Sequence, residues 1–503
     1  MEHVVVLMLE NRSFDHMLGY LRHPSAEFDG LLGGGPYSSP GWEGGPAVAA
    51  APGAGPLTVE DPDHSHDAAV EQFHGAGFVS SLERKGRGLA QPRFGGLLGP
   101  VIEWFYLRFA ARDGVPGLGP EVMRCQDPAE VPVLATLATS FAVCTRWFCS
   151  VPGETWPNRN FVHAASSDGE TSIHPRLYAN RTIFEVLEEA GHRWHVYHDD
   201  VPQVWAFPAL WNTEGRLAGW YDISDFSQHV MNGELPAYSF IEPNHRPPIR
   251  LNDRPSNSQH PGNNLVRDQA PGESTDFARA EELIASVYEA LRGNPAVFAK
   301  TVLVVTYDEH GGLYDHVMPM TGLADPGPAR GFFARFFHWL AHKRSADFDF
   351  SWSGGRVPAV VISPLIPAAT VCATPLEHAS VPATLRALFT PSAPPLTARD
   401  RDAARFDDLC TLPAPRTDLP DLSAYVGVRQ AAARAEDAPA PQADRLPPHC
   451  RELAVLARRV RARLRGRPAI LPRVSWPARD RRAVAQALPE FRAAAENARN
   501  SPG

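Results

Sequence analysis

The sequence predicts an α/β fold with a mostly parallel central sheet and helices on both faces. Three apolar runs have the length and composition of buried strands: Val4 to Leu9, Thr301 to Tyr307 and Val357 to Ile362. Helical stretches such as Arg181 to Ala190 and Glu281 to Leu291 stand between them. Strands that alternate with helices are typical of a parallel sheet that is covered on both faces.

Polar pairs follow two of these strands directly. Glu10-Asn11 comes after the first strand, and Asp308-Glu309 comes after the second. In open parallel sheets, ligands bind in the crevice beyond the carboxyl ends of the strands. We therefore expect the two pairs to meet in space although they are far apart in the sequence.

Bulk composition excludes several classes of protein. The 503 residues are 44% hydrophobic, enough for one large core or two ordinary ones. The formal charge of -9 provides no global positive field, so we expect no nucleic acid partner. No run reaches the ~20 apolar residues of a membrane helix, and the first residues lack a charged leader region. This predicts a cytoplasmic protein for the chain as given, and a secreted or periplasmic one if its start is truncated.

The six cysteines are scattered, without a CxxC spacing or a dense framework. Buried free thiols are the simpler interpretation. A pairing of Cys144 with Cys149 stays open for an oxidising compartment.

The chain divides by composition into residues 1–427 and an Ala/Arg/Pro-rich tail, residues 428–503. Within the first part, Gly33 to Pro56 reads as an irregular insertion. Within the tail, seven arginines lie in Arg451 to Arg467, where Leu453, Leu456, Val460 and Leu464 keep helical spacing. This basic amphipathic helix suits an anionic membrane surface or a partner subunit, or it docks on its own domain with the arginines in water.

The two polar pairs offer hard oxygen ligands, and the chain has no zinc-finger or HExxH spacing. Oxygen-rich sites suit Mg, Mn or Ca better than structural zinc. Either pair alone is equally consistent with a helix cap or a salt bridge.

A third element, VPGETWPNR at Val151 to Arg159, places the hydroxyl of Thr155 in a proline-bracketed turn. A hydroxyl next to a metal can act as a nucleophile, because coordination lowers its pKa. The alternative is a threonine that caps a helix in a tight loop. Ser150, Ser166 and Ser167 are rival hydroxyls.

Several histidines lie in polar, turn-like segments, and each of them is also consistent with a structural role. These are His64 and His66 in DPDHSHD, His260 in NSQHPGNN, and His310 and His316 in DEHGGLYDH. Phosphoryl transfer needs hydrogen-bonding groups around the phosphate and an acid for the leaving oxygen, which histidines can supply. Gly311-Gly312 indicates a close backbone approach or a simple turn.

With these residues in place, the chain resembles a phosphoesterase family that includes non-specific phospholipases C and certain bacterial acid phosphatases, within the alkaline-phosphatase-like superfamily. The resemblance covers roughly residues 3 to 420. It rests on four ordered blocks and a weaker fifth: ENRSFDHMLGYL (Glu10 to Leu21), PGETWPNR (Pro152 to Arg159), YSFIEP (Tyr238 to Pro243), TYDEHGGLYDHV (Thr306 to Val317) and PRTDLP (Pro415 to Pro420).

The resemblance implies an alkaline-phosphatase-like fold, a catalytic domain at residues 1–427, and one divalent metal, with zinc as a further option. The metal and nucleophile positions match Glu10, Asn11, Thr155, Asp308 and Glu309, with Thr155 transiently phosphorylated. His64 and His260 match positions that line the phosphate and protonate the leaving group. We further expect Asn11, Asn158, Arg159 and His310 to bind substrate.

Three departures from the family limit the transfer of function. Relatives often carry a second histidine shortly after the His-Pro pair, where this chain has Asn263. The β-rich C-terminal domains and twin-arginine signal of exported bacterial members are also not evident.

From the residues and the resemblance together, we expect a phospholipase C-like phosphodiesterase acting on phospholipid, with a broad phosphomonoesterase acting on small phosphate esters as the alternative. A membrane-associated binding protein without turnover is disfavoured, because Thr155 and all four ligands are retained. The oligomeric state is not indicated.

Overall fold

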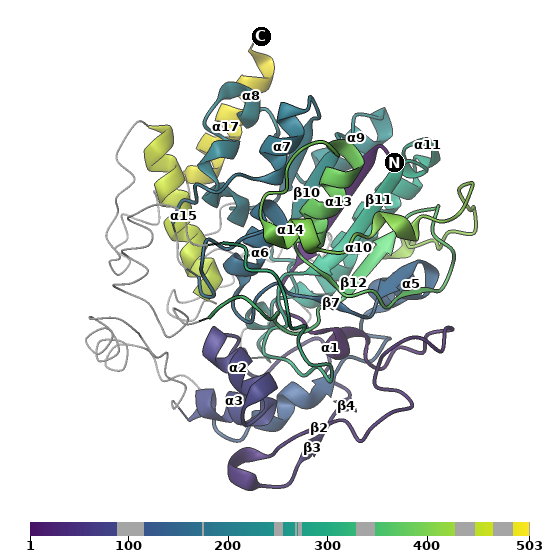
Figure 1. Ribbon diagram of the computed structural model, residues 1–503, viewed down its shortest axis with the longest axis vertical. Helices are drawn as coiled ribbons and strands as arrows, with labels where there is room; N and C mark the ends of the chain where they lie inside the picture. The colour runs from purple at the N-terminus through teal and green to yellow at the C-terminus, as the bar shows by residue number, and fades with distance from the viewer. Residues whose placement is uncertain are drawn as a thin grey trace.

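A computed structural model describes residues 1–87, 115–173, 176–245, 255–266, 269, 274–327, 348–427, 448–465 and 486–501. Its centre is an eight-stranded sheet with the order β13-β6-β12-β11-β1-β10-β8-β9 (Figure 1). Only β12 runs antiparallel to its neighbours, so the predicted α/β fold class is confirmed. The strands are β1 (His3–Leu9), β6 (Ala142–Cys144), β8 (Trp194–His198), β9 (Trp220–Asp222), β10 (Tyr238–Glu242), β11 (Thr301–Tyr307), β12 (Ala359–Ile362) and β13 (Thr370–Cys372).

The three central strands β11, β1 and β10 are mostly apolar and almost entirely buried, because both of their faces are covered. In the parallel register, Val6 of β1 lies beside Phe240 of β10 and Val304 of β11. The strands predicted from the first two apolar runs are confirmed. The third run forms β12, which is shorter than predicted and is the strand that departs from the parallel order.

The helices form two groups, and members contact one another within each group. One group holds α6 (Thr155–Ala164), α7 (Ile183–Glu189), α13 (Ser380–Phe389) and α14 (Ala398–Asp402). The other holds α5 (Pro132–Ser140), α9 (Asp225–Asn232), α10 (Asp276–Arg292) and α11 (Pro295–Phe298). Helices α7 and α10 confirm the two helical stretches predicted above, and α10 is longer than predicted.

A smaller layer lies at the lower end of the sheet in Figure 1. It contains α1 (Phe14–Leu18), α2 (His66–His74), α3 (Phe78–Gly86) and the short strands β2 (Ser38–Ser39), β3 (Val48–Ala49), β4 (Ala51–Pro52) and β5 (Arg124–Cys125). Its own small core includes Phe73, Phe78 and Leu82. The predicted insertion at residues 33–56 belongs to this layer, and it is mostly irregular and exposed as expected.

The C-terminal tail folds back on the chain through α15 (Pro448–Leu464) and α17 (Ala487–Asn500) (Figure 1). Phe491 of α17 is fully buried, with its ring centroid 4.4 Å from that of Trp205 and 5.2 Å from that of Trp220. Leu453 and Val460 on the apolar face of α15 are buried as well. Of the alternatives given for this helix, docking on its own chain is the one observed. Because the apolar face of α15 is buried against the chain, it is not free for contact with a membrane. Residues 428–447 of the tail lie outside the described part.

Cys125, Cys144, Cys149, Cys372 and Cys410 are free thiols, and all of them except Cys410 are buried. Cys144 lies opposite Cys372 in the register of β6 and β13, and the suggested bond from Cys144 to Cys149 is not formed. In the described part of the chain, no helix has the length and hydropathy needed to cross a membrane.

Candidate active site

Three adjacent parallel strands bring acidic residues to one edge of the sheet. Asp308 follows β11, Glu10 follows β1, and Glu242 is the last residue of β10. All three side chains are fully buried. The two predicted pairs meet as expected, since the backbone N–H of Asn11 donates to Asp308 Oδ1 at 2.9 Å.

The turns that carry these pairs pack against each other more closely than ordinary side chains would allow. Asn11 itself has a φ of +54°, a left-handed conformation that asparagine tolerates better than most residues. Gly311 has a φ of +69°, and a Cβ there would collide with the carbonyl oxygen of Asn11. A Cβ on Gly312 would collide with the carbonyl oxygen of Asp63. The predicted close backbone approach at this glycine pair is confirmed.

Thr155 is the first residue of α6, and its hydroxyl lies 3.4 Å from Asn11 Oδ1. The turn before it is held by Asn158, whose Oδ1 accepts from the backbone N–H of Val151 at 3.0 Å. Asn158 Nδ2 also donates to the carbonyls of Val151 and Gly153, at 3.1 and 3.2 Å. The structure places the amide of Asn158 on the backbone that orients Thr155, and its expected role in substrate binding stays a prediction.

The rival hydroxyls have other partners. Ser150 Oγ donates to Glu377, which in turn pairs with Arg399 at 2.8 Å. Ser166 Oγ accepts from the backbone N–H of Asp168, and Ser167 Oγ donates to the carbonyl of Glu170. Among the four hydroxyls considered, Thr155 is the one that faces the acidic edge of the sheet.

Arg159 lies one turn after Thr155 on α6 and is fully buried beneath the carboxylates. Its Nε donates to Asp308 Oδ2 at 3.1 Å, and its Nη1 lies 3.6 Å from Glu242 Oε2. Burial alone would lower the pKa of Arg159, but Asp308 and the neighbouring glutamates raise it. Arg159 thus binds the carboxylates, and its expected role in substrate binding stays a prediction.

Two residues beside this edge, Glu242 and His245, were not predicted. His245 Nδ1 lies 3.0 Å from Glu10 Oε1, and His245 Nε2 lies 3.0 Å from Glu242 Oε2. Although burial opposes the charge, the two glutamates raise the pKa of His245 to about 10. Despite the same burial, His245 and Arg159 lower the pKa of Glu242 to about 2. Glu242 ends the apolar strand in the YSFIEP block, so the pattern that pointed to Glu10 could also have found it.

Glu309 is as fully buried as Asp308 and has no arginine within ion-pair distance among the described residues. Its Oε2 accepts from the backbone N–H of Gly311 at 2.7 Å, and its Oε1 lies 3.9 Å from His64 Nε2. Burial, and after it the charge of Asp308, raise the pKa of Glu309 well above its usual range. His310 was expected to bind substrate. Its ring is fully buried, with Nε2 2.7 Å from Gln72 Oε1 and Nδ1 3.6 Å from Glu309 Oε2, a placement that supports Glu309.

The two predicted catalytic histidines face each other, with ring centroids 5.8 Å apart. His64 Nδ1 lies 2.8 Å from the carbonyl of Pro62, so this nitrogen carries a proton and Nε2 points toward Glu309. His260 Nδ1 instead accepts from the backbone N–H of Gly262 at 2.9 Å, so its proton sits on Nε2. The amide of Asn263 donates to Ser258 Oγ at 3.2 Å. In the neutral rings, Nε2 of His64 is therefore a hydrogen-bond acceptor, whereas Nε2 of His260 is a donor.

We name Glu10, Asn11, Thr155, Asp308 and Glu309 the catalytic cluster. Its donor atoms are carboxylate, amide and hydroxyl oxygens, which suit a hard divalent cation. Glu309 Oε1 is buried without a hydrogen-bond partner among the described residues. Burial also raises the pKa of Asp308, which Arg159 offsets only in part. Buried carboxylates that repel one another fit a metal, which would neutralise them.

A second buried group, which we name the arginine cluster, contains Asp15, Asp315, His316 and Arg356. One ligand atom from each of Asp15, Asp315 and His316 lies within 4.8 Å of the others, a spacing that can hold an ion and that the three carboxylates of the catalytic cluster do not meet. However, Arg356 Nε already donates to Asp315 Oδ1 at 2.8 Å, and Arg356 Nη2 donates to Asp15 Oδ1 at 2.9 Å. His316 Nδ1 donates to Asp15 Oδ2 at 2.6 Å. These cations occupy the lone pairs that a metal would need.

Residues 1–390 match the sequence pattern of the Phosphoesterase family. This chain belongs to the phosphoesterase family. The match includes every residue of the catalytic cluster, together with His64 and His260. The chain is accordingly a phosphoric ester hydrolase, and the resemblance inferred from its sequence blocks is confirmed.

This phosphoesterase is similar to non-specific phospholipase C3 of Arabidopsis thaliana, with 34% identity over 83% of this chain and 75% of the relative. It is also 30% identical to phospholipase C B of Mycobacterium tuberculosis, over 81% of this chain and 76% of the relative. Solved structures are more distant. An alkaline phosphatase superfamily protein from Vibrio parahaemolyticus has a TM-score of 0.29 and 10% identity, covering 51% of this chain and 60% of that chain.

Proposed function

We propose that this phosphoesterase is a metal-dependent, phospholipase C-type phosphodiesterase that uses Thr155 as its nucleophile. The observation that carries the proposal is the placement of the Thr155 hydroxyl, 3.4 Å from Asn11 Oδ1 and at the first turn of α6. The substrate class follows from the relatives, which are phospholipases C by name.

The catalytic cluster is the group that would hold the divalent cation, with oxygen ligands from its five members. Such a cation would lower the pKa of the Thr155 hydroxyl and neutralise charge on the phosphate oxygens. Ca, Mg or Mn suits these ligands best, and Zn is a further option.

In the first step, Thr155 Oγ1 attacks phosphorus and the bond to the leaving alcohol breaks, which leaves a phosphothreonine. Thr155 begins a helix of ten residues, whose first backbone N–H groups favour bound phosphate. Asn158 and His66 hold the turn in place, since His66 Nδ1 lies 2.6 Å from the carbonyl of Pro152. This turn therefore fixes the direction of attack.

The leaving oxygen needs a proton. The hydrogen bonds of the two histidines suit His64 to supply this proton and His260 to bind the phosphate. His64 Nδ1 is already a donor to Pro62, so protonation of Nε2 gives an imidazolium that can release this proton to the alcohol. His260 Nδ1 accepts from Gly262 and disfavours a second ring proton. His260 then donates its Nε2 hydrogen to the phosphate as a fixed hydrogen-bond donor.

In the second step, water attacks the phosphothreonine, the bond from phosphorus to Thr155 breaks, and Thr155 recovers its proton. After the first step, His64 is neutral with an available lone pair on Nε2, so it accepts the proton of the attacking water. His64 thus acts as the acid for the leaving alcohol and then as the base for the water, while the proton that Thr155 releases to solvent when it attacks returns to Oγ1 from solvent when the phosphothreonine is cleaved.

The deciding experiment compares the parent with Thr155→Ala and Thr155→Ser on phosphatidylcholine and p-nitrophenyl phosphate, with and without EDTA. We expect phosphatidylcholine turnover that EDTA abolishes and that Thr155→Ala lowers on the order of 10⁴-fold or more. Thr155→Ser keeps a hydroxyl and should retain measurable activity. Turnover of the monoester alone would favour a phosphomonoesterase, and turnover of neither substrate with any added metal would refute both functions.

The role of His64 has its own test, because an acid matters less when the leaving group is already good. We expect His64→Asn to lower turnover of phosphatidylcholine strongly, and that of p-nitrophenyl phosphorylcholine only weakly. Equal losses on both substrates would contradict the assignment of His64 as the acid.

A further inference from the structure

Two short segments hold Glu242 and His245, which we name the supporting pair because they lie against Glu10 of the catalytic cluster. The first segment is the 3-10 helix η3 (Gln203–Ala206), whose first two backbone N–H groups donate to Oε2 and Oε1 of Glu242 at 2.9 and 3.1 Å. The second segment follows β8, where Asp200 Oδ2 accepts from the backbone N–H of His245 at 3.0 Å. The place of the supporting pair beside Glu10 therefore depends on both segments.

Helix α17 of the C-terminal tail contacts both segments with two consecutive residues. The ring of Phe491 packs on that of Trp205 in η3. Arg492 Nη2 donates to the carbonyl of Asp199 at 3.0 Å and lies 2.7 Å from Asp222 Oδ2 at the end of β9. Asp199 is the chain neighbour of the aspartate that binds the supporting pair. One turn of α17 therefore touches the segment behind each member of that pair.

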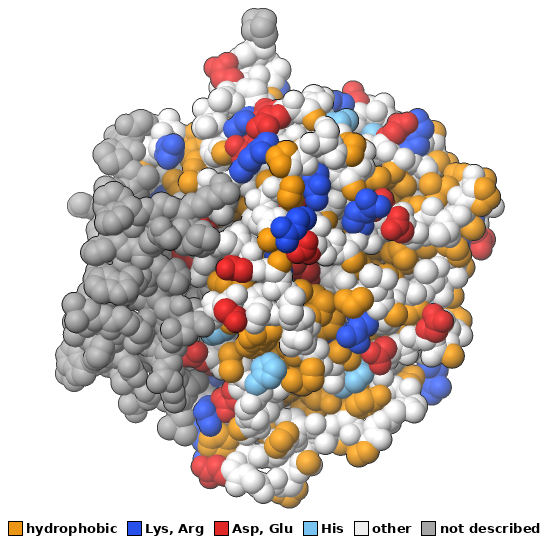
Figure 2. Space-filling model, in the orientation of Figure 1, with side chains coloured by type: hydrophobic (Ala, Val, Ile, Leu, Met, Phe, Trp, Pro, Cys, Tyr) orange, Lys and Arg blue, Asp and Glu red, His pale blue; other side chains and the backbone are white. Residues whose placement is uncertain are grey.

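The other helix of the tail strengthens the same contact. Helix α15 packs on η3, and its Leu453 and Val460 are buried. Arg461 and Arg465 of α15 pair with Glu490 of α17, which joins the two helices of the tail. Figure 2 shows basic and acidic side chains intermixed on the upper part of this face, where Figure 1 places α17. The tail is thus held to the chain by buried apolar residues and by individual charge pairs.

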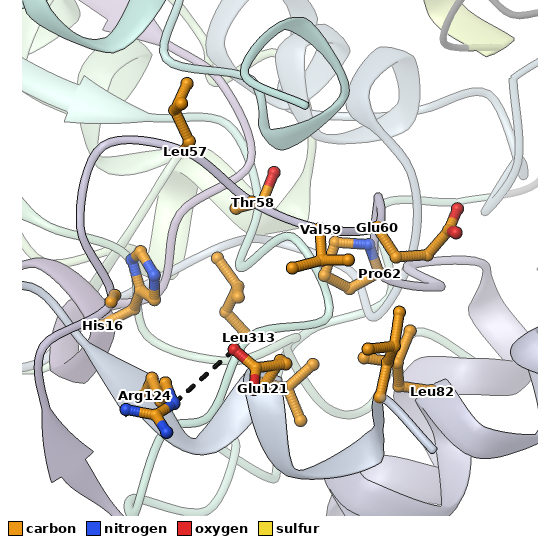
Figure 3. A pocket seen from close by; sticks show the side chains of 13 residues that line it. His16, Leu57, Thr58, Val59, Glu60, Pro62, Leu82, Glu121, Arg124 and Leu313 are labelled. Carbon is orange, nitrogen blue, oxygen red and sulfur yellow. Dashed lines mark ion pairs between the residues drawn. The ribbon is translucent and has the colours of Figure 1, made fainter. Parts of the chain in front are cut away.

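Packing beside the supporting pair is closer than packing beside the loop that carries His64. That loop borders the hollow shown in Figure 3, whose lining includes Thr58, Glu60 and Pro62. In contrast, Trp205 of η3 is fully buried under Phe491. A displacement of the tail would therefore be transmitted to the supporting pair through groups that are in direct contact.

We propose that Phe491 and Arg492 are positioning residues of the active site, which keep the supporting pair in place against Glu10. Both residues lie beyond residues 1–390, the part that matches the family. The inference rests on the proposed metal-dependent function, since Glu10 is one of the residues that would hold the cation. Loss of a residue that orients a metal ligand typically weakens metal binding 10- to 100-fold. The tail residues act one contact further out, so we expect an effect of about tenfold.

The test measures metal binding by the full chain without substrate. Protein is freed of metal with chelator, dialysed, and titrated with Ca, Mg or Mn in a calorimeter, which gives the dissociation constant. Phe491→Ala removes the ring that packs on η3, and Arg492→Met removes the charge but keeps most of the stem. Arg492→Lys is the conservative variant, because a lysine still offers a cation to the two acceptors of Arg492.

Two control variants separate positioning from a general loss of stability. Phe298→Ala truncates a fully buried phenylalanine and destabilises the core. Phe298 ends α11, just before β11 begins, so it lies at the end of the sheet opposite the catalytic cluster. Arg465→Met removes an ion pair within the tail and leaves Phe491 and Arg492 unchanged.

We expect Phe491→Ala and Arg492→Met to raise the dissociation constant about tenfold, with Arg492→Lys and both controls close to the parent. Parent-like values in Phe491→Ala and Arg492→Met would overturn the positioning role, as would an equal rise in Phe298→Ala. An equal rise in Arg492→Lys and Arg492→Met would overturn the role of the Arg492 charge. If circular dichroism shows that Phe491→Ala does not fold, the partly exposed Arg492 decides the question alone.

The failure of this inference is distinguishable from the failure of the proposed function. If the parent binds metal and hydrolyses phosphatidylcholine while the tail variants bind metal like the parent, only the positioning role is wrong. If the parent binds none of the three cations and hydrolyses neither phosphatidylcholine nor p-nitrophenyl phosphate, the metal-dependent function is wrong, and the positioning role is wrong with it.

Discussion

The catalytic cluster and the arginine cluster both take their acidic residues from the same two chain segments, residues 10–16 and 308–316, and both are buried. Thr155 and Arg356 join them from other parts of the chain. The two clusters differ in charge. In the arginine cluster, Arg356 and His316 oppose the two buried carboxylates of Asp15 and Asp315. Beside the catalytic cluster, Arg159 and His245 lie against the buried carboxylates of Glu10, Glu242 and Asp308. In the described part of the chain, the side chains within ion-pair distance of Glu309 are the rings of His64 and His310.

This difference supports the proposal that the catalytic cluster, and not the arginine cluster, would hold a metal. Ligand atoms lie closer together in the arginine cluster, but its lone pairs are bound to cations that belong to the protein. The catalytic cluster has the looser spacing, and burial raises the pKa values of its members Asp308 and Glu309. A buried charge without a partner destabilises the fold, so an imbalance of this kind is tolerated where a ligand corrects it. The balance of charge, more than proximity, separates a binding site from a structural network.

The largest effect that this comparison predicts is on stability, at Arg356. Arg356→Leu removes the cation that both buried aspartates of the arginine cluster share. We expect the free energy of unfolding to fall by about 3–5 kcal/mol, as when one partner of a buried ion pair is removed. Urea unfolding followed by circular dichroism measures this change.

Arg401→Leu is the control for that variant, because Arg401 is exposed and pairs with its neighbour Asp402 on the surface. It should unfold like the parent. If Arg356→Leu also unfolded like the parent, the arginine cluster would not be the structural network described here.

The catalytic cluster was partly predictable, because its position depends on local pattern. An apolar strand that ends in a polar pair marks the carboxyl edge of a parallel sheet, and this placed Glu10 beside Asp308 correctly. The adjacent glycine pair correctly indicated a close approach. Glu242 follows the same rule, but a single acidic residue after a strand is a weak signal without knowledge of which strands are neighbours.

Other features depend on tertiary contacts that a sequence pattern does not contain. Nothing local to Arg159 shows that it points inward to the carboxylates instead of outward to substrate. The same holds for Asn158, whose amide binds the turn before Thr155. The amphipathic spacing of α15 indicates an apolar face, but only the structure shows that this face packs on the chain itself.

The next largest effect is stabilisation by a divalent cation, which should depend on one cluster only. Adding Ca, Mg or Mn to protein treated with chelator should raise the free energy of unfolding by about 2.7 kcal/mol at a hundred times the dissociation constant. Asp308→Asn and Glu309→Gln should abolish the rise, whereas His316→Gln should keep it. If His316→Gln abolished the rise and the other two variants kept it, the metal site would be assigned to the arginine cluster.

A smaller effect is a pH dependence that belongs to the arginine cluster. Burial alone would lower the pKa of His316, but its bonds to Asp15 and Asp29 raise it to about 9. The folded state holds this proton more tightly than the unfolded state, so the stabilisation is complete below about pH 6.5 and is lost as the pH rises through about 9. At low pH, we expect the free energy of unfolding of the parent to exceed that of His316→Gln by about 2 kcal/mol. Above pH ~9.5, the two values should approach each other. Parallel curves for the two proteins would contradict this.

The smallest predicted effect is a substitution that stabilises the fold, in contrast to His316→Gln. It is confined to the catalytic cluster in the absence of metal. Burial and Asp308 raise the pKa of Glu309, so the folded state binds this proton more tightly than the unfolded state and loses stability as the pH rises above the usual glutamate range. In the presence of chelator, Glu309→Gln should therefore unfold at a higher urea concentration than the parent. Its free energy of unfolding should be higher by about 1 kcal/mol, with the largest gain at high pH.

Glu242→Gln is the matched variant. Because His245 and Arg159 lower the pKa of Glu242 against the effect of burial, its loss should destabilise the fold under the same conditions. Destabilisation by both variants would mean that the catalytic cluster is as well compensated as the arginine cluster, and the contrast between them would fail.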